Sequence, residues 1–282
     1  EVTNGDFSQE GSEQVTNGDF ANWSGGLPNS WNQLGGSGDA NNYIEEYQGK
    51  LRIVSNGGSG AAVEQNALIV GKIYKVTADL VVNSGGGMRF QLGANSTHHI
   101  YTTTQSIEFY AECDGTNGYL QIIRQGTTDF TIDNVSVKEV GQGFTFGDGW
   151  GMGDDLAECD GTQTNVTNLS ANTGNTTTAG SFYKITYTIS NYSAGTVRVN
   201  LGAWGTYRSA DDTYTEYIQD TGGGSRIVLQ GNTDFVGSID NISVKEVGQH
   251  WDFGSSWSTN GTEAIFTTGS GTAIESPIGL IG

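Results

Sequence analysis

The sequence predicts an all-β protein of tandem antiparallel jelly-roll β-sandwich domains with an incomplete third unit. The first observation behind this is that DNVSVKEVGQ at 133–142 recurs as DNISVKEVGQ at 240–249, an offset of 240 − 133 = 107. Two further landmarks repeat in the same order, with an offset of 183 − 74 = 109: YKVTADL at 74–80 with YKITYTI at 183–189, and MRFQLGA at 88–94 with VRVNLGA at 197–203. Together they describe a duplicated domain of roughly 105 to 125 residues, a common domain size.

Alternating apolar and polar residues predict the strands. In 74–80 the apolar side chains stand at every second position, which is the period of a strand with one buried face. The Asp133-Asn134 pair breaks one such row, as a β-bulge does. No window has helical spacing over three turns, so almost no helix is expected. The predicted buried rows are Tyr74/Val76/Ala78/Leu80, Met88/Phe90/Leu92, Leu120/Ile122, Ile132/Val135/Val137, Tyr183/Ile185/Tyr187/Ile189, Val197/Val199/Leu201 and Ile227/Leu229.

The repeated tail sets the expected domain boundaries. Short alternating strands about ten residues apart, separated by Gly- and Asn-rich turns, are typical of a β-sandwich. Because each tail is followed at once by an aromatic-rich opening, almost no linker remains, and a stiff rod is predicted. The expected parts are an extra N-terminal strand segment at 1–14, a first jelly-roll sandwich at 15–142, a second at 143–249, and the start of an incomplete third at 250–282.

The two ends of the chain carry unmatched pieces of the repeat. VTNGDF stands at 2–7 and again at 15–20, so an extra opening strand precedes the first complete domain. At the other end, 282 − 249 = 33 residues are too few to close a sandwich core. Two explanations stay open: the sequence stops inside a longer protein, or another subunit completes the third unit by strand addition.

Charge and cysteine content limit the classes of function. With 31 acidic against 12 basic residues, the net charge of −19 repels nucleic-acid phosphates and anionic lipid head groups. No stretch approaches the roughly 18 apolar residues of a membrane span, so neither nucleic acid nor membrane insertion is expected. Cys113 and Cys159 lie in copies of AECDGT whose spacing does not match the domain period. A disulfide between them and a pair of free, partly buried thiols are the alternatives.

Longer stretches resemble a known family. VTNGDFANWSGGLPNSW at 15–31 with FTIDNVSVKEV at 130–140, and YKITYTISNYSAGTVRVNLG at 183–202 with GSIDNISVKEV at 237–247, resemble carbohydrate-binding-module 4/9-like jelly rolls. Such repeats occur in tandem in tail-fibre and other structural proteins of bacteriophages, especially marine ones. The resemblance covers roughly residues 15 to 249. The second repeat departs from the pattern, because it has Phe146-Gly147-Asp148-Gly149 where the first has Asn-Gly-Asp-Phe.

The resemblance also implies a structural calcium ion between the opening strand and the closing Asp. The ligands implied are Asp19 with Asp133, and Asp148 with Asp240. Because calcium takes six to eight oxygens, backbone carbonyls or water must join each pair. The alternative is that Asp133 and Asp240 cap the bulge through nearby backbone amides.

Outward-facing polar and aromatic residues predict a glycan-binding surface in each repeat. Aromatic faces stack on the apolar side of a sugar, while amides and arginines bond its hydroxyl groups. The alternative is that these side chains pack on a neighbouring domain or subunit, where Trp, Tyr and Arg are common anchors. The candidates are Arg89, Gln91, His98 and Tyr101 in the first repeat, and Arg198, Asn200, Trp204 and Tyr207 in the second.

No residue pattern marks a catalytic site. Acidic residues are plentiful, but nothing singles out the two carboxylates that a glycosidase needs at a set separation, and no zinc or phosphate-binding motif occurs. We therefore expect a protein that is not an enzyme. The tandem repeat predicts a rod- or fibre-forming structural protein, and the family resemblance implies a location in a virion or outside the cell, most of all in a phage tail fibre. Other copies, virion proteins and a weakly bound cell-surface glycan are the expected partners. The alternative is a carbohydrate-binding segment of a secreted bacterial enzyme or adhesin.

Overall fold

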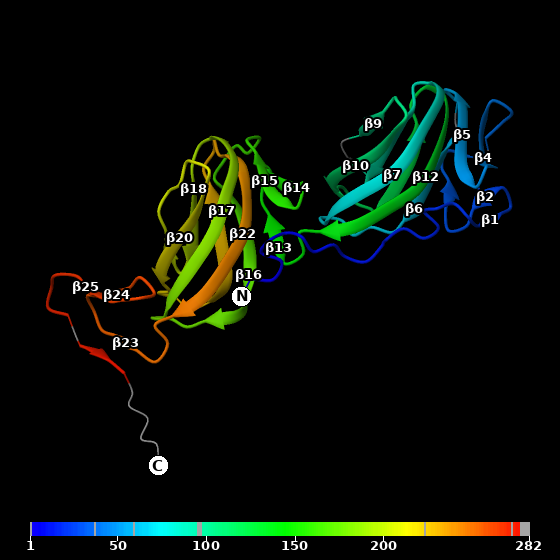
Figure 1. Ribbon diagram of the computed structural model, residues 1–282. Coiled ribbons are helices and arrows are strands. Elements are labelled where there is room, and N and C mark those ends of the chain that lie inside the picture. The colour runs from blue at the N-terminus through cyan, green and yellow to red at the C-terminus, as the bar shows by residue number, and fades with distance from the viewer. Residues whose placement is uncertain are drawn as a thin grey trace, which may run out of the picture. The chain divides into compact units, whose positions relative to one another are not determined.

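The computed structural model describes residues 2–36, 38–58, 60–94, 98–222, 224–271 and 273–276, and these residues form strands and turns without a helix. The chain divides into two compact units. One contains residues 10–140, and the other joins residues 1–9 to residues 141–282. We call residues 10–140 the first sandwich, residues 2–9 with 141–249 the second sandwich, and residues 250–276 the C-terminal segment. The predicted all-β architecture is confirmed (Figure 1).

The first sandwich consists of two five-stranded antiparallel sheets and a small hairpin. The sheet orders are β10-β7-β12-β5-β4 and β3-β6-β11-β8-β9, and β1 pairs with β2. The strands are β1 (Trp23–Ser24), β2 (Leu27–Pro28), β3 (Asn32–Gln33), β4 (Asn42–Tyr47), β5 (Lys50–Asn56), β6 (Ala62–Asn66), β7 (Ile73–Gly85), β8 (Met88–Leu92), β9 (His99–Tyr101), β10 (Gln105–Glu112), β11 (Tyr119–Arg124) and β12 (Thr127–Val140).

The second sandwich repeats the two five-stranded sheets strand for strand and lacks a counterpart of the β1–β2 hairpin among its described residues. Its sheet orders are β14-β15-β22-β17-β20 and β13-β16-β21-β18-β19, and its longest strands, β17 and β22, lie side by side as β7 and β12 do in the first (Figure 1). The strands are β13 (Phe144–Phe146), β14 (Trp150–Gly153), β15 (Leu156–Asp160), β16 (Thr167–Thr177), β17 (Phe182–Ala194), β18 (Val197–Leu201), β19 (Ala203–Trp204), β20 (Asp212–Gln219), β21 (Gly224–Gly231) and β22 (Val236–Val247).

The C-terminal segment reproduces only the opening strands of this plan. Strands β23 (Asp252–Phe253), β24 (Trp257–Thr259), β25 (Ala264–Phe266) and β26 (Ile274–Glu275) follow one another as β13 to β16 do. The pairing also matches, because β23 pairs with β26 as β13 does with β16, and β24 with β25 as β14 does with β15. The described residues of this segment therefore form one hairpin, β24–β25, and one strand pair, β23–β26, that encloses it in sequence.

The alternating rows predicted from the sequence form the core of each sandwich. In β7 the side chains of Tyr74, Val76 and Leu80 are buried, and Lys75 between them is not. In β17 the same holds for the apolar row around Tyr187. Each fully buried Leu or Phe adds about 1.5–3 kcal/mol to the hydrophobic stabilisation.

The predicted bulge lies in the closing strand of both sandwiches. The pairing of β12 with β7 shifts register between Asp133 and Ser136, and that of β22 with β17 shifts at the equivalent place. Asn134 and Asn241 occupy left-handed backbone conformations there, with φ of 51° and 53°. Asn tolerates this conformation better than most residues do, which explains the Asp-Asn pair in each repeat.

The two cysteines are free and buried, one in each sandwich. The Cys113 thiol donates to the backbone oxygen of Asn117 at 3.6 Å, and the Cys159 thiol to Oε1 of Gln163 at 3.5 Å. Burial raises the pKa of both thiols to about 11. Of the two alternatives for this pair, the structure has the free thiols.

Candidate functional site

Residues 2–7 provide the second sandwich with the Asn-Gly-Asp-Phe motif that the second repeat lacks in its own sequence. Although residues 2–7 come before the first sandwich, they belong to the second. The Ile242 amide in β22 donates to the backbone oxygen of Gly5 at 2.8 Å, and the ring of Phe7 lies 4.4 Å from that of Phe144. The segment expected to be a surplus strand thus supplies the Asn-Gly-Asp-Phe motif that residues 146–149 lack.

Residues 15–20 make the equivalent contacts in the first sandwich. There the Val135 amide in β12 donates to the backbone oxygen of Gly18 at 2.9 Å, and the ring of Phe20 lies 5.4 Å from that of Trp31. Phe7 and Phe20 are both fully buried. The two Asn-Gly-Asp-Phe segments therefore dock on the two sandwiches in the same way.

Asn4, Gly5 and Phe7 each make a different contact when residues 2–7 dock on the second sandwich. Asn4 Oδ1 accepts a hydrogen bond from the Gln9 amide at 2.9 Å, which fixes the turn. A Cβ on Gly5 would lie 2.1 Å from the backbone oxygen of Ile242, so only glycine permits the close approach. Phe7 has a left-handed φ of 52°, a conformation that costs about 1–2 kcal/mol. Burial of its ring offsets that cost.

An arginine and two aromatic rings form a compact cluster on the outer face of the second sandwich. The Arg198 guanidinium on β18 lies 3.8 Å from the ring centre of Trp204 and 4.5 Å from that of Tyr207. Both rings are about half exposed, Trp204 at 47% and Tyr207 at 55%. Asn200 is paired with Trp204 across β18 and β19. The structure thus brings together the four residues predicted in this repeat.

The loop that carries these rings is held in place by a buried carboxylate. Glu216 Oε2 on β20 accepts a hydrogen bond from the Thr206 amide at 2.7 Å. Its Oε1 accepts one from the Tyr187 hydroxyl at 2.8 Å and lies 3.5 Å from Nε of Arg208. Burial, with Glu216 as the next cause, raises the pKa of Tyr187 above its usual range. Trp204 and Tyr207 therefore stand on a fixed loop.

The predicted residues of the first sandwich are not all brought together. Arg89 and Gln91 lie on the outer face of β8, and Gln91 Oε1 lies 3.1 Å from Nε2 of His98. Tyr101 pairs with the buried Met88 and packs against the core instead. His99, the neighbour of His98, also points inward and stacks on Phe109 with ring centres 4.0 Å apart.

Asp19, Asp133 and Asp240, which are implied for calcium, accept hydrogen bonds from backbone amides one or two residues away. Asp133 and Asp240 each accept a bond from the next amide, at 2.8 and 2.6 Å, as bulge caps do. Asp19 Oδ1 accepts from the Ala21 amide at 3.3 Å. Among the described residues, no group of three or more His, Cys, Asp or Glu side chains is placed to hold a metal ion. The carboxylates of these aspartates therefore do not form a calcium site by themselves, since calcium takes six to eight oxygen ligands. The bound calcium ion stays a prediction.

Asp240 lies in an acidic environment that includes a residue of the N-terminal segment. Burial raises the pKa of Asp240, and the charges of Asp6 and Asp155 raise it further. Asp6 belongs to the N-terminal Asn-Gly-Asp-Phe segment, as Asp19 belongs to the other. The carboxylates whose charges act on the Asp240 pKa are thus Asp6 and Asp155, and Asp148 is not among the causes of its shift.

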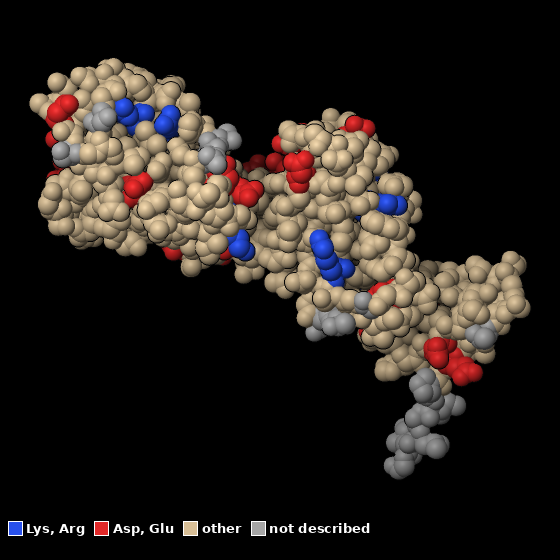
Figure 2. Space-filling view, turned by 180° about the vertical axis from the view of Figure 1, so that it is seen from behind, with Lys and Arg blue, Asp and Glu red and all other residues tan. Residues whose placement is uncertain are grey.

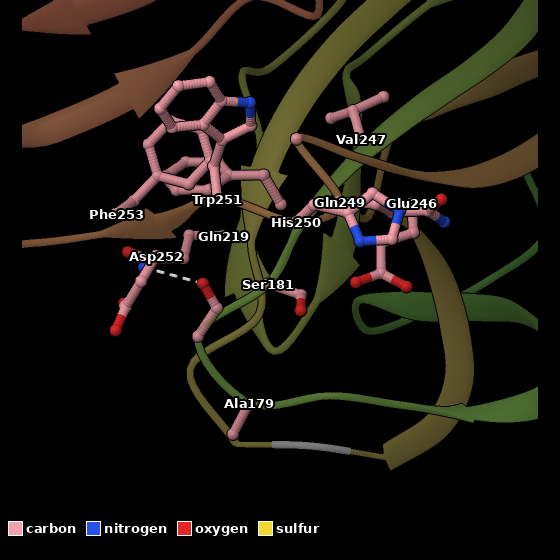
Figure 3. Close-up of a pocket in the computed structure, with 13 residues that line it drawn as sticks. Ala179, Ser181, Gln219, Glu246, Val247, Gln249, His250, Trp251, Asp252 and Phe253 are labelled. Atoms are coloured by element: carbon pink, nitrogen blue, oxygen red, sulfur yellow. Dashed lines mark hydrogen bonds between the residues drawn. The ribbon is translucent and has the colours of Figure 1, made fainter. Parts of the chain in front are cut away.

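Aromatic residues of the C-terminal segment line a hollow beside the second sandwich. It has a volume of about 390 Å³ and is lined by Phe182, Trp251 and Phe253 among others. Trp251 and Phe253 lie together on one side, with Glu246 and Gln249 on the other (Figure 3). Trp251 occupies the position that Phe144 has in the preceding repeat, yet it is 52% exposed.

The surface carries few charged groups. On the face drawn in Figure 2, the acidic and basic side chains are scattered among uncharged residues. In the described part of the chain, no helix has the length and apolar character needed to cross a membrane.

Comparisons with known proteins find structural neighbours only. Neither a protein-family model nor a curated protein sequence matches the chain. The tandem carbohydrate-binding modules CBM22-1 and CBM22-2 of Xyn10C from Paenibacillus barcinonensis are similar, with 8% identity, a TM-score of 0.34, and 85% of this chain and 99% of that chain covered. Allantoicase from Saccharomyces cerevisiae has 12% identity, a TM-score of 0.29, and coverages of 72% and 80%. What those proteins bind or catalyse is a property of those proteins, and this chain stands as an all-β protein of antiparallel sandwiches.

Proposed function

We propose that the chain is a non-enzymatic structural protein that forms rods or fibres in an extracellular appendage, in particular a phage tail fibre or another virion fibre. The observation that carries the proposal is the insertion of residues 10–140 into the second sandwich. The chain therefore passes between the two units twice, after Gln9 and after Val140. Two covalent connections resist separation and twisting better than one linker does, because a single linker leaves the relative motion of domains as the default.

The two connecting stretches are joined to each other by hydrogen bonds, one in the first sandwich and one in the second. In the first sandwich the Gly11 amide donates to the backbone oxygen of Glu139 at 2.8 Å. In the second, Nδ2 of Asn4 donates to the backbone oxygen of Gln142 at 3.4 Å. The first connection has three exposed residues, Ser8 to Glu10, whereas Val140 and Gly141 of the second are buried.

The repeat continues into the C-terminal segment without a linker. Gly248 repeats the left-handed conformation of Gly141, with φ of 69° at both residues. The Trp251 amide donates to the Gly248 oxygen at 3.1 Å, as the Phe144 amide donates to that of Gly141. An array that extends in the same way from one unit to the next supports a fibre.

Electron microscopy of the full chain without sugar tests the proposal. We expect elongated particles that associate into longer rods or filaments as the concentration rises. Compact monomers at every concentration would contradict it. Small-angle scattering provides the second measurement, because a pair of units that tumble independently would give the signature of a flexible chain.

A glycan-binding function is the second candidate, and the cluster of Arg198, Trp204 and Tyr207 favours it. Two half-exposed rings on a fixed loop suit stacking on a sugar. In addition, Nε of Arg198 is buried without a hydrogen-bond partner among the described residues, as is Nε of Arg89 in the first sandwich. Weak sites repeated along a fibre would gain strength from multivalency. The same cluster would serve a carbohydrate-binding segment of a secreted bacterial enzyme or adhesin.

A glycan array with matched variants separates the two candidates. Trp204→Ala should remove binding, whereas Trp251→Ala, which changes an equally exposed tryptophan outside the cluster, should leave it. A dedicated sugar-binding module should bind as a monomer. A fibre protein whose Trp204 serves sugar binding should still assemble as Trp204→Ala, whereas loss of assembly in this variant would show that Trp204 packs against another subunit.

A further inference from the structure

Residues 2–7 dock on the second sandwich although no short stretch of chain connects them to it. The whole first sandwich lies between this segment and Gly141 in the sequence. The segment is held by non-covalent interactions alone: the bond from the Ile242 amide to the Gly5 oxygen at 2.8 Å, the packing of Phe7 on Phe144, and the close approach of Gly5 to β22. A groove of about 350 Å³ runs along the segment, and residues of the segment and of β22 line it, among them Asn4 and Lys245.

Nothing in the hexapeptide itself distinguishes its own groove from another. Residues 2–7 and 15–20 are both Val-Thr-Asn-Gly-Asp-Phe. Each buries its phenylalanine fully. In each, the glycine leaves no room for a Cβ, which would lie 2.1 Å from the Ile242 oxygen in one case and 2.0 Å from the Val135 oxygen in the other. Chain connection alone, through a high effective concentration, decides which groove a given segment fills.

The segment can leave its groove without disturbing the first sandwich. Ser8 and Gln9 are exposed, and their amides bond to Asp6 and Asn4 inside the segment. From Glu10 onward the chain is attached to the first sandwich, because Glu10 Oε2 lies 2.8 Å from Nζ of Lys138. The bonds that would rotate on release therefore lie between Ser8 and Glu10.

We propose that the groove of the second sandwich accepts residues 2–7 of a second copy of this chain, so that copies join by exchanging this segment. The inference rests on the proposed structural function, for which it supplies the interface between copies. The segment makes the same hydrogen bond and the same ring packing whichever copy provides the groove, and exchange of this kind is a low-cost route to oligomers. A reciprocal exchange closes a dimer, and a one-way exchange continues as an open chain.

A peptide experiment tests whether the groove accepts the segment in trans. The chain without residues 1–9 is mixed with a labelled peptide of residues 1–10, EVTNGDFSQE. We expect saturable one-to-one binding. A peptide of residues 14–23, QVTNGDFANW, should bind within about threefold, because it carries the same hexapeptide. Peptides with Gly5→Ala or Phe7→Ala should bind at least about tenfold more weakly. Failure of the first peptide to bind a folded chain would overturn the proposal.

A second experiment uses the full chain, in case the shortened one does not fold. Two batches that carry donor and acceptor fluorophores are mixed at high concentration, warmed and then diluted. Exchanged copies should retain energy transfer long after dilution. Gly5→Ala should reduce the signal at least about tenfold, while Gly151→Ala, a glycine on β14 with no atom within 4 Å of an added Cβ, should not. No transfer at any concentration, or equal transfer in the Gly5→Ala chain, refutes the exchange.

The outcomes separate this inference from the proposed function. Rods that form equally well in the Gly5→Ala chain would leave the structural function standing and remove the exchange. Peptide binding and exchange without any rod would support the inference and remove the fibre.

Discussion

The ring of Phe7 lies 4.4 Å from the ring of Phe144, although the whole first sandwich separates them in the sequence. This contact joins residues 2–7 to the second sandwich, although the first sandwich follows them directly in the sequence. It makes the first sandwich an insertion in the second. The two sandwiches are therefore joined by two stretches of chain, whereas two consecutive domains are usually joined by a single linker.

The first prediction concerns the two buried phenylalanines. Phe7→Ala should lower the free energy of unfolding of the second sandwich by about 3–5 kcal/mol, because it leaves a cavity beside Phe144. Hydrogen exchange of the full chain locates the effect. Protection should fall at the Ile242 amide, which donates to Gly5, and stay at the Val135 amide, which donates to Gly18. Phe20→Ala should give the reverse pattern, and an equal decrease at both amides in one variant would contradict the assignment.

The second prediction concerns the buried carboxylate under the Trp204 loop. Glu216→Ala should destabilise the second sandwich by about 3–5 kcal/mol, since Arg208 loses its partner and the Tyr187 hydroxyl loses its acceptor. Chemical denaturation measures the change. Glu45→Ala is the control, because Glu45 pairs with Arg52 at a more exposed site, and its removal should cost about 1 kcal/mol or less. Equal effects of the two substitutions would show that Glu216 does not anchor the loop.

The third prediction concerns the stability that the chain loses in acid when Asp129 is protonated. Hydrogen bonds from Arg52, at 2.7 and 2.9 Å, hold the pKa of Asp129 below its usual range. A lowered folded-state pKa stabilises the protein fully above about pH 4, the ordinary value for an unfolded Asp, and this stabilisation is lost as the pH falls through the folded-state pKa. Unfolding followed from pH 5 to pH 2 should show the loss. Asp129→Asn should flatten this part of the curve, and an unchanged slope would assign the acid sensitivity to other groups.

The fourth prediction concerns Asp240, whose pKa is raised by burial and by Asp6 and Asp155. A carboxyl with a raised folded-state pKa favours folding at low pH and loses that contribution as the pH rises through the folded-state pKa. In calcium-free buffer at pH 7, Asp240→Asn should therefore stabilise the second sandwich. Thermal unfolding measures this. If added calcium instead stabilises the original chain and the substitution removes that effect, Asp240 is a calcium ligand.

The fifth prediction concerns the thiols. Because burial raises the pKa of Cys113 and Cys159 to about 11, only about one thiol in a thousand is ionised at pH 8. A disulfide reagent should react with neither cysteine in the folded chain and with both after denaturation. Reaction of one thiol in the folded chain would show that its sandwich opens locally.

Much of the fold follows from the sequence because strands have a short, local period. Tyr74, Val76 and Leu80 face the core since successive side chains alternate across a sheet. The Asp133-Asn134 bulge was equally predictable, because an Asp-Asn pair interrupts that period. The gathering of Trp204 and Tyr207 around Arg198 followed from the same alternation and from a short loop.

The sequence by itself determined the repeat, the strands, their buried faces and the bulge, all of which depend on neighbours a few residues apart. Tertiary structure decided which face Tyr101 takes, because pairing with Met88 turns it inward and a shift of one residue would turn it outward. It also decided where residues 2–7 dock. Two identical hexapeptides have identical local preferences, so no local feature assigns residues 2–7 to the second sandwich. The chain connection places them there, and Phe7 packs on Phe144 across the full length of the first sandwich in sequence.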